Sequence, residues 1–264
     1  MNTIKERIED IKTNGYQLDF GTVFESAFEN YKKIVLYAGL MLLVFMVLFI
    51  AFMTTGIIYY IGINNMDAFN EKIKHFSTLK TIPLNILLPF EAGIILLSGF
   101  LSPFYAGFLK MAHYGDKDEE FHLSSMFTYY KSPYFGNIFI STIILSLISS
   151  GISLIFELAE IQIIGVFISL TISFLTFLTV PLIVFGNLNA IDAIKSSTII
   201  VSKQPLIIVG LLIVAIIAAI IGLFGFCIGI FFTIPFLYSM YYAIYSAIIG
   251  VDFEDNSNQL DFEI

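Results

Sequence analysis

The chain has 264 residues, of which 58% are hydrophobic and only 13% are charged, and its formal net charge is −8. A soluble domain carries about 25% charged residues, so this composition excludes an ordinary water-soluble domain and indicates a surface that faces lipid. The acidic balance argues against nucleic acid as a partner.

Residues 1–33 form the first predicted region, a cytoplasmic amphipathic segment ahead of the first membrane-spanning helix. Within 20–31, apolar residues recur at helical spacing: Phe20, Phe24, Ala27, Phe28 and Tyr31. This pattern predicts a helix lying on the membrane surface. No cleavable secretory signal is expected, because the segment mixes both signs of charge.

The region 34–251 contains uncharged stretches long enough to cross a membrane, since about 20 apolar residues span the hydrocarbon core. Six transmembrane helices are predicted, at about 34–63, 82–109, 134–156, 161–188, 205–224 and 226–251. The last two share one charge-free run, in which Gly222, Gly225 and Gly229 favour a tight turn. Residues 252–264 form an acidic tail without a basic residue, expected to be disordered or at most a docking peptide.

The distribution of basic residues predicts the orientation. Ten of the 13 lysines and arginines precede the first crossing or lie between crossings two and three or four and five. Lys72, Lys74 and Lys80 lie on the opposite side. Because basic residues gather on the cytoplasmic side, both termini are expected in the cytoplasm.

Lysine occurs immediately ahead of crossings one, three and five. A lysine there marks the headgroup level, and a following proline ends one helix and fits the first turn of the next. The predicted interfacial anchors are Lys32, Lys33, Lys131, Pro133, Lys203 and Pro205. At Lys33 no proline follows, so the turn into the bilayer is expected to come from other residues.

The second, fourth and sixth crossings each contain a proline, Pro103, Pro181 or Pro235, followed by Phe or Leu. These prolines are predicted to break their helices. The unit of surface helix, crossing and return crossing with a proline therefore occurs three times. The predicted fold is an all-α polytopic bundle of three helical hairpins, each preceded by an amphipathic interfacial helix. The alternative is three hairpins that share only the general rules of membrane helices.

The segments "AIDAIKSSTIIVSKQPLIIVGLLIV" and "GLFGFCIGIFFTIPFLYSMYYAIY" give the chain a family resemblance over about residues 188–245. It resembles uncharacterised six-helix bacterial integral membrane proteins related to the membrane domain of glycerophosphoryl diester phosphodiesterases. The resemblance implies a membrane fold and the bacterial cytoplasmic (inner) membrane. It implies no activity, because the phosphodiesterase catalytic domain has no counterpart here.

Glu91 is the acidic residue expected inside a crossing, where a charge costs about 2.5–3.5 kcal/mol at the bilayer centre. Together with serines of the third crossing it is predicted to line a cavity; these serines are Ser141, Ser146, Ser149 and Ser150. The alternative for Glu91 is a carboxylate that reaches the outer interface or pairs with Lys80. The alternative for the serines is hydrogen bonding and packing between helices.

Signs of reaction chemistry are missing from the sequence. It contains no His-Glu-x-x-His, Gly-x-Ser-x-Gly, Walker A or dinucleotide motif. His113 and His122 lie in an acidic stretch that is predicted to be a solvated loop, so we expect no catalytic residues, no metal site and no cofactor.

The leading functional expectation is a non-enzymatic inner-membrane protein. It would act on membrane lipids or serve as an accessory or scaffold to a partner membrane protein. The alternative is a transporter or channel for a small or amphiphilic solute, with Glu91 and the third-crossing serines around its path.

Overall fold

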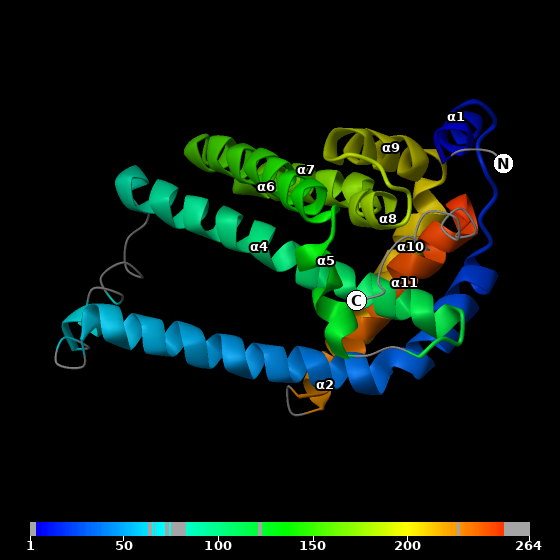
Figure 1. Ribbon diagram of the computed structural model, residues 1–264. Helices are drawn as coiled ribbons and strands as arrows, with labels where there is room; N and C mark the ends of the chain where they lie inside the picture. Colours follow the sequence, from blue (N-terminus) through cyan, green and yellow to red (C-terminus); the bar gives the residue numbers. More distant parts are fainter. Residues whose placement is uncertain are drawn as a thin grey trace.

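The structure is a computed structural model that describes residues 4–62, 65, 67–71, 74, 83–120, 123–225 and 228–250. Within these ranges the chain is helical and contains no β-strand. The elements are α1 (Ile4–Asn14), α2 (Phe20–Ile61), α4 (Leu84–Asp116), η2 (Leu123–Phe127), α5 (Thr128–Lys131), α6 (Phe135–Leu158), α7 (Gln162–Thr176), α8 (Thr179–Val184), α9 (Ala190–Lys203), α10 (Pro205–Ile221), η3 (Gly222–Phe224) and α11 (Gly229–Ile249) (Figure 1). The predicted all-α fold is confirmed. The acidic tail, 252–264, lies outside the described residues.

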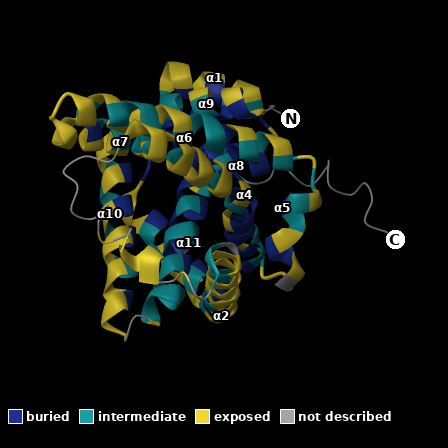
Figure 2. Cartoon of the chain, turned by 90° about the vertical axis from the view of Figure 1, so that its left-hand side faces the viewer, coloured by how far each residue is buried: buried dark blue, intermediate teal, exposed yellow. Residues whose placement is uncertain are grey.

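Six helical segments of the described chain are long and apolar enough to cross a membrane: Phe20–Tyr59, Leu84–Asp116, Phe135–Leu158, Gln162–Val184, Pro205–Phe224 and Gly229–Ile249. Many large apolar side chains on them are exposed, such as Leu48, Phe167 and Leu206. Figure 2 shows the buried residues on α4 and α11 in the middle and exposed residues along α7 and α10. This surface suits lipid rather than water, and the chain is a multi-pass membrane protein.

Helix α2 corrects the expectation of a separate surface helix before the first crossing. It runs from Phe20 to Ile61 without a break at Lys33 or Ile34, because neither proline nor glycine interrupts the helix there. The ribbon changes direction in its N-terminal part instead (Figure 1). Asp19 caps the start, since its carboxylate accepts from the Thr22 backbone N–H at 2.7 Å.

Both Lys-x-Pro segments separate two helices, as predicted. Helix α5 ends at Lys131 and α6 begins at Phe135, beyond Pro133. Helix α9 ends at Lys203, and Pro205 is the first residue of α10, where its missing N–H removes no helical hydrogen bond.

Of the three prolines predicted to break a helix, only Pro181 does so. Helix α7 ends at Thr176 and α8 begins at Thr179, because the Pro181 ring clashes with the carbonyl four residues earlier. Pro103 and Pro235 lie inside the continuous helices α4 and α11, so the prediction was wrong for them. The carbonyl of Gly99, four residues before Pro103, instead accepts the Ser102 hydroxyl at 2.7 Å.

A hydroxyl from another unit donates to a backbone carbonyl shortly before each of these prolines, three residues before Pro103 and Pro235 and six before Pro181. The three hydrogen bonds are Tyr31 Oη to Phe232 O at 3.0 Å, Tyr130 Oη to Phe100 O at 2.8 Å, and Ser197 Oγ to Leu175 O at 2.8 Å. The donors belong to the helices preceding crossings one, three and five. They join α2 to α11, α5 to α4, and α9 to α7, so the three hairpins are linked in a closed ring.

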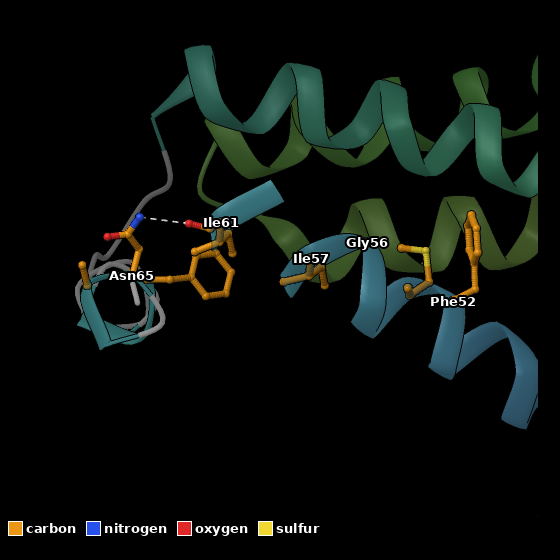
Figure 3. Close-up of a pocket in the computed structure, with 8 residues that line it drawn as sticks. Phe52, Gly56, Ile57, Ile61 and Asn65 are labelled. Atoms are coloured by element: carbon orange, nitrogen blue, oxygen red, sulfur yellow. Dashed lines mark hydrogen bonds between the residues drawn. The ribbon is translucent and has the colours of Figure 1, made fainter. Parts of the chain in front are cut away.

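The half of α2 that approaches Ile61 is exposed on all sides from Ala51 to Ile57. A cavity of about 820 Å³ lies beside it, lined by Phe52, Met53, Gly56, Ile57, Ile61, Asn65, Ala68 and Phe69 (Figure 3). The side-chain amide of Asn65 donates to the Ile61 carbonyl at 3.0 Å, and the described residues of the lining carry no charge. We use "far end" for the end of the bundle that carries Ile61, Leu84 and Leu158.

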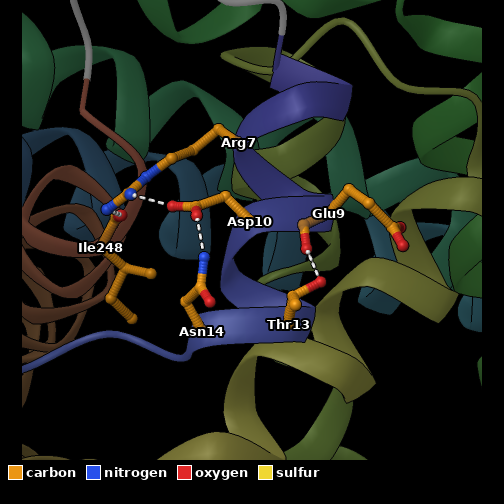
Figure 4. A network of polar contacts seen from close by, with 6 residues as sticks. All are labelled: Arg7, Glu9, Asp10, Thr13, Asn14 and Ile248. Carbon is orange, nitrogen blue, oxygen red and sulfur yellow. Dashed lines mark hydrogen bonds and ion pairs between the residues drawn. The ribbon is translucent and has the colours of Figure 1, made fainter.

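The opposite end, here named the terminal end, carries α1, α9 and the last turn of α11. Arg7 on α1 donates to the carbonyl of Ile248 at 2.9 Å and pairs with Asp10 at 3.1 Å (Figure 4). Lys203 donates to the carbonyl of Lys12 at 2.6 Å. The chain's first helix is therefore docked onto the third unit through α9 and α11, which the sequence did not reveal.

The segment after α1 is held at the junction of α9 and α10. The Tyr16 hydroxyl donates to the Ile200 carbonyl at 2.9 Å. Gln204 accepts from the Leu18 backbone N–H at 3.1 Å and donates to the Tyr16 carbonyl. Gln204, the middle residue of the second Lys-x-Pro segment, thus holds the N-terminal segment through two hydrogen bonds.

Replacing Ser197 tests the bond beside the Pro181 break. The Ser197 side chain is fully buried, donates to Leu175 O and accepts from the Leu178 N–H at 3.2 Å. Ser197→Ala leaves both backbone groups unpaired, so the free energy of unfolding should fall by about 1–3 kcal/mol. Unfolding in mixed detergent micelles measures the free energy of unfolding of each variant. Ser202→Ala, an exposed serine on the same helix that bonds only to its own turn, is the control; equal losses in both variants would contradict the assignment.

The docked Tyr16 should make stability pH-dependent. Burial raises the pKa of the Tyr16 hydroxyl to about 12, whereas tyrosine in an unfolded chain titrates near about 10. The folded chain therefore holds this proton more tightly, and the stability it contributes is complete below about pH 10 and is lost as pH rises toward about 12. Tyr16→Phe should flatten the fall of the unfolding temperature over this range. If the unfolding temperature of Tyr16→Phe falls with pH as steeply as that of Tyr59→Phe, a variant at an exposed site, the docked Tyr16 does not cause the pH dependence.

Candidate functional site

A groove between α4 and α6 is the strongest candidate site. Its volume is about 560 Å³, and it lies in the half of both helices nearest the far end. The lining residues are Leu87, Leu88, Glu91, Ala92, Ile95, Leu96, Ile143, Leu147, Ser150, Gly151, Ser153, Leu154 and Glu157. Its walls are therefore mostly aliphatic, with four polar side chains among them.

Glu91 points across the groove toward α6. Its Oε2 accepts the Ser150 hydroxyl at 2.5 Å, a distance typical of a hydroxyl bound to a carboxylate. The half-buried Glu91 is thus held between two helices. Lys80, the alternative partner considered from the sequence, lies outside the described residues.

The four predicted cavity serines occupy different positions on α6. Ser150 lines the groove, and Ser146 faces Ser98 of α4 with their hydroxyl oxygens 3.3 Å apart. Ser141 is buried and donates to its own helix. The backbone carbonyl of Ser149 accepts from Ser169 of α7 at 3.5 Å. The structure therefore brings Glu91 together with only one of the four.

The groove ends toward the terminal end where α4 and α6 approach most closely. A Cβ atom on Gly99 would lie 2.9 Å from Ile143 Cδ1 and from Phe139 Cε2. The Phe100 and Phe139 rings pack edge to face with centroids 5.1 Å apart. Aromatic and aliphatic side chains thus form the floor of the groove.

Glu157 is a lining residue that sequence reasoning did not assign to the cavity. The sequence alone predicts Glu157 and Glu160 in the turn after crossing three, either as solvated residues or as an outer acidic rim together with Glu91. Seven residues separate it from Ser150 on α6, or about 10 Å at 1.5 Å per residue. Its register against Glu91 depends on how α4 and α6 pack, which helical periodicity alone does not specify.

A second polar cluster lies deep in the terminal end and corrects the loop prediction for His113. Helix α4 continues to Asp116, and His113 is only 8% exposed. Its Nδ1 lies 3.1 Å from the Tyr242 hydroxyl, which donates to Asp116 at 3.0 Å. No helix breaker follows Leu109 before Gly115, so the helix extends beyond the predicted boundary. His122 lies outside the described residues.

The same end contains a buried amide that joins three helices. Asn30 of α2 donates to the Ala112 carbonyl of α4 at 2.5 Å and accepts from Ser239 of α11 at 2.9 Å. All of these groups are partnered within a closely packed core, so this cluster is suited to holding the helices together. The α4–α6 groove combines open volume with a carboxylate. Among the described residues, the buried cluster lacks the open volume, and the 820 Å³ cavity lacks the carboxylate.

The predicted interfacial lysines have distinct partners. Lys32 pairs with Glu29 at 2.6 Å and lies over the Phe28 ring at 5.5 Å, and Lys33 pairs with Asp118 at 2.7 Å. Lys131 and Pro133 are exposed. Lys203 is the residue that binds the end of α1. Exposed pairs of this kind contribute little stability.

Comparison with protein-family models, with curated proteins and with solved structures found no match. The resemblance to bacterial six-helix membrane proteins therefore stays a prediction.

A double-mutant cycle tests the Glu91–Ser150 contact. The coupling free energy between Glu91→Gln and Ser150→Ala should be about 0.5–2 kcal/mol, the range for hydrogen bonds between membrane helices. Unfolding in mixed micelles supplies the four stabilities. Ser146→Ala, one turn away and bonded to Ser98, gives the matched control cycle with Glu91→Gln. Equal coupling in the two cycles would show that Glu91 does not bind Ser150.

Proposed function

We propose that this protein is a non-enzymatic membrane protein that binds a lipid-like amphiphile in the α4–α6 groove. The observation that carries the proposal is the Glu91–Ser150 pair inside an aliphatic groove that opens on the lipid-facing side of two helices. A polar anchor in an apolar cleft matches a molecule with a polar head and an alkyl body. The volume of about 560 Å³ lies within the range of small-molecule sites, about 300–1,000 Å³.

The open sides of the groove support an amphiphile over a soluble solute. Leu96 and Leu147 line it, yet they remain 52% and 55% exposed. An alkyl chain can therefore leave the groove sideways into surrounding lipid while its head stays beside Glu91. A strictly water-soluble ligand would gain nothing from these two leucines.

Transport is the second candidate, and the position of Glu91 between two helices favours it. A path toward the terminal end would have to pass the close contact of Gly99 with Phe139 and Ile143. Pro103 lies one turn beyond Gly99 in α4 and leaves a helical hydrogen bond missing there. A bend of α4 at this point would open the floor, so binding would be the first step of transport.

The proposal places the protein in a bacterial inner membrane with both termini in the cytoplasm. The far end, and with it the groove, then faces the outer leaflet. We further propose that the three hairpins descend from one repeated unit, and the three hydroxyl bonds beside Pro103, Pro181 and Pro235 support this.

Purification in polymer discs with surrounding lipid tests the binding proposal. A filled-groove variant is available in Gly151→Leu, because no atom lies within 4 Å of a Cβ built on Gly151 and leucine favours helix. Mass spectrometry should find an amphiphile enriched with the wild-type protein and lost from Gly151→Leu. Identical lipid profiles would contradict the proposal, and a stoichiometric protein companion in both samples would favour the scaffold function instead.

A further inference from the structure

The charges that line the groove all have one sign. Glu91 and Glu157 are its two ionisable lining residues, and neither lysine nor arginine contributes to the lining among the described residues. The aliphatic side chains of the walls carry no charge. An anionic head would meet like charge beside aliphatic walls, which is unfavourable.

The two carboxylates lie at different levels of the groove. Glu91 has the Ser150 hydroxyl on one oxygen, and a carboxylate can accept several further hydrogen bonds. Glu157 lies nearer the far end, about 10 Å further along α6. A cationic head lying between them would meet negative charge from both sides.

We infer that the ligand is a cationic amphiphile, with one amine or quaternary ammonium head and one alkyl chain. This inference rests on the proposed function of the same groove and adds the charge class of its ligand. The head lies at Glu91 on the Glu157 side, and the chain passes Ile95 and Ile143 to leave beside Leu96 and Leu147. Charge complementarity with two carboxylates selects this class against fatty acids, alkyl sulfates and phosphate-headed lipids.

The absence of tryptophan from the chain allows a single fluorescent reporter. Leu96→Trp places a tryptophan where the alkyl chain would leave the groove. Ile163→Trp, on α7 and 73% exposed outside the groove, reports quenching by bulk lipid. Three mid-chain brominated probes of equal length are added to zwitterionic nanodiscs: hexadecylammonium, hexadecyl sulfate and neutral hexadecanol.

The ammonium probe should half-quench Leu96→Trp at a mole fraction about tenfold lower than the sulfate probe, with no such preference at Ile163→Trp. Adding Glu91→Gln and Glu157→Gln, which keep side-chain size, should reduce the preference to less than about twofold. Groove-specific quenching by hexadecanol with equal potency of ammonium and sulfate would overturn the charge inference and leave amphiphile binding intact. If Gly151→Leu changes the quenching of Leu96→Trp by none of the probes, the proposed function itself fails.

Discussion

Every backbone group of a helix at membrane depth needs a partner inside the protein, because lipid supplies none. Prolines in α4, α8 and α11 each leave the carbonyl of the residue four positions earlier without its helical partner. Ser102, on the same helix, donates to one of these carbonyls, that of Gly99. Tyr31, Tyr130 and Ser197 donate from other helices to the nearby carbonyls of Phe232, Phe100 and Leu175. These bonds also tie each hairpin to the next. The three inter-helix hydroxyl bonds thus hold the hairpins in a closed ring.

The two ends of the bundle differ in consequence. At the terminal end, Asn30, His113 and Tyr242 form partnered contacts among α2, α4 and α11, and α1 covers the outside. Toward the far end such contacts become sparse, and α4 and α6 leave a groove where Glu91 meets Ser150. The partnered contacts at the terminal end can keep α4 and α6 in register at the far end. This division supports the proposal that a ligand binds in the groove and not in the packed core.

Composition and charge-free runs predicted the helices well, because lipid imposes length and apolarity on each crossing. The Lys-x-Pro junctions were also readable, since proline acts locally. Predictions failed where tertiary contacts decide: Pro103 and Pro235 remain helical, α2 passes Lys33 unbroken, and His113 is buried. Glu91 was identified as a cavity residue, but its pairing with Ser150 and not with Ser141 or Ser149 depends on helix rotation. Glu157 was missed for the same reason.

A disulfide tests most directly whether α4 and α6 face each other across the groove. Ser98 and Ser146 have hydroxyl oxygens 3.3 Å apart, so cysteines there can approach disulfide geometry. Ser98→Cys/Ser146→Cys, in a Cys227→Ser background, should cross-link rapidly under mild oxidation in native membranes, whereas Ser98→Cys/Ser149→Cys should not. Efficient cross-linking only in the first pair is the result expected from this packing. No cross-link, or equal cross-linking in both pairs, would mean that α4 and α6 do not form the groove.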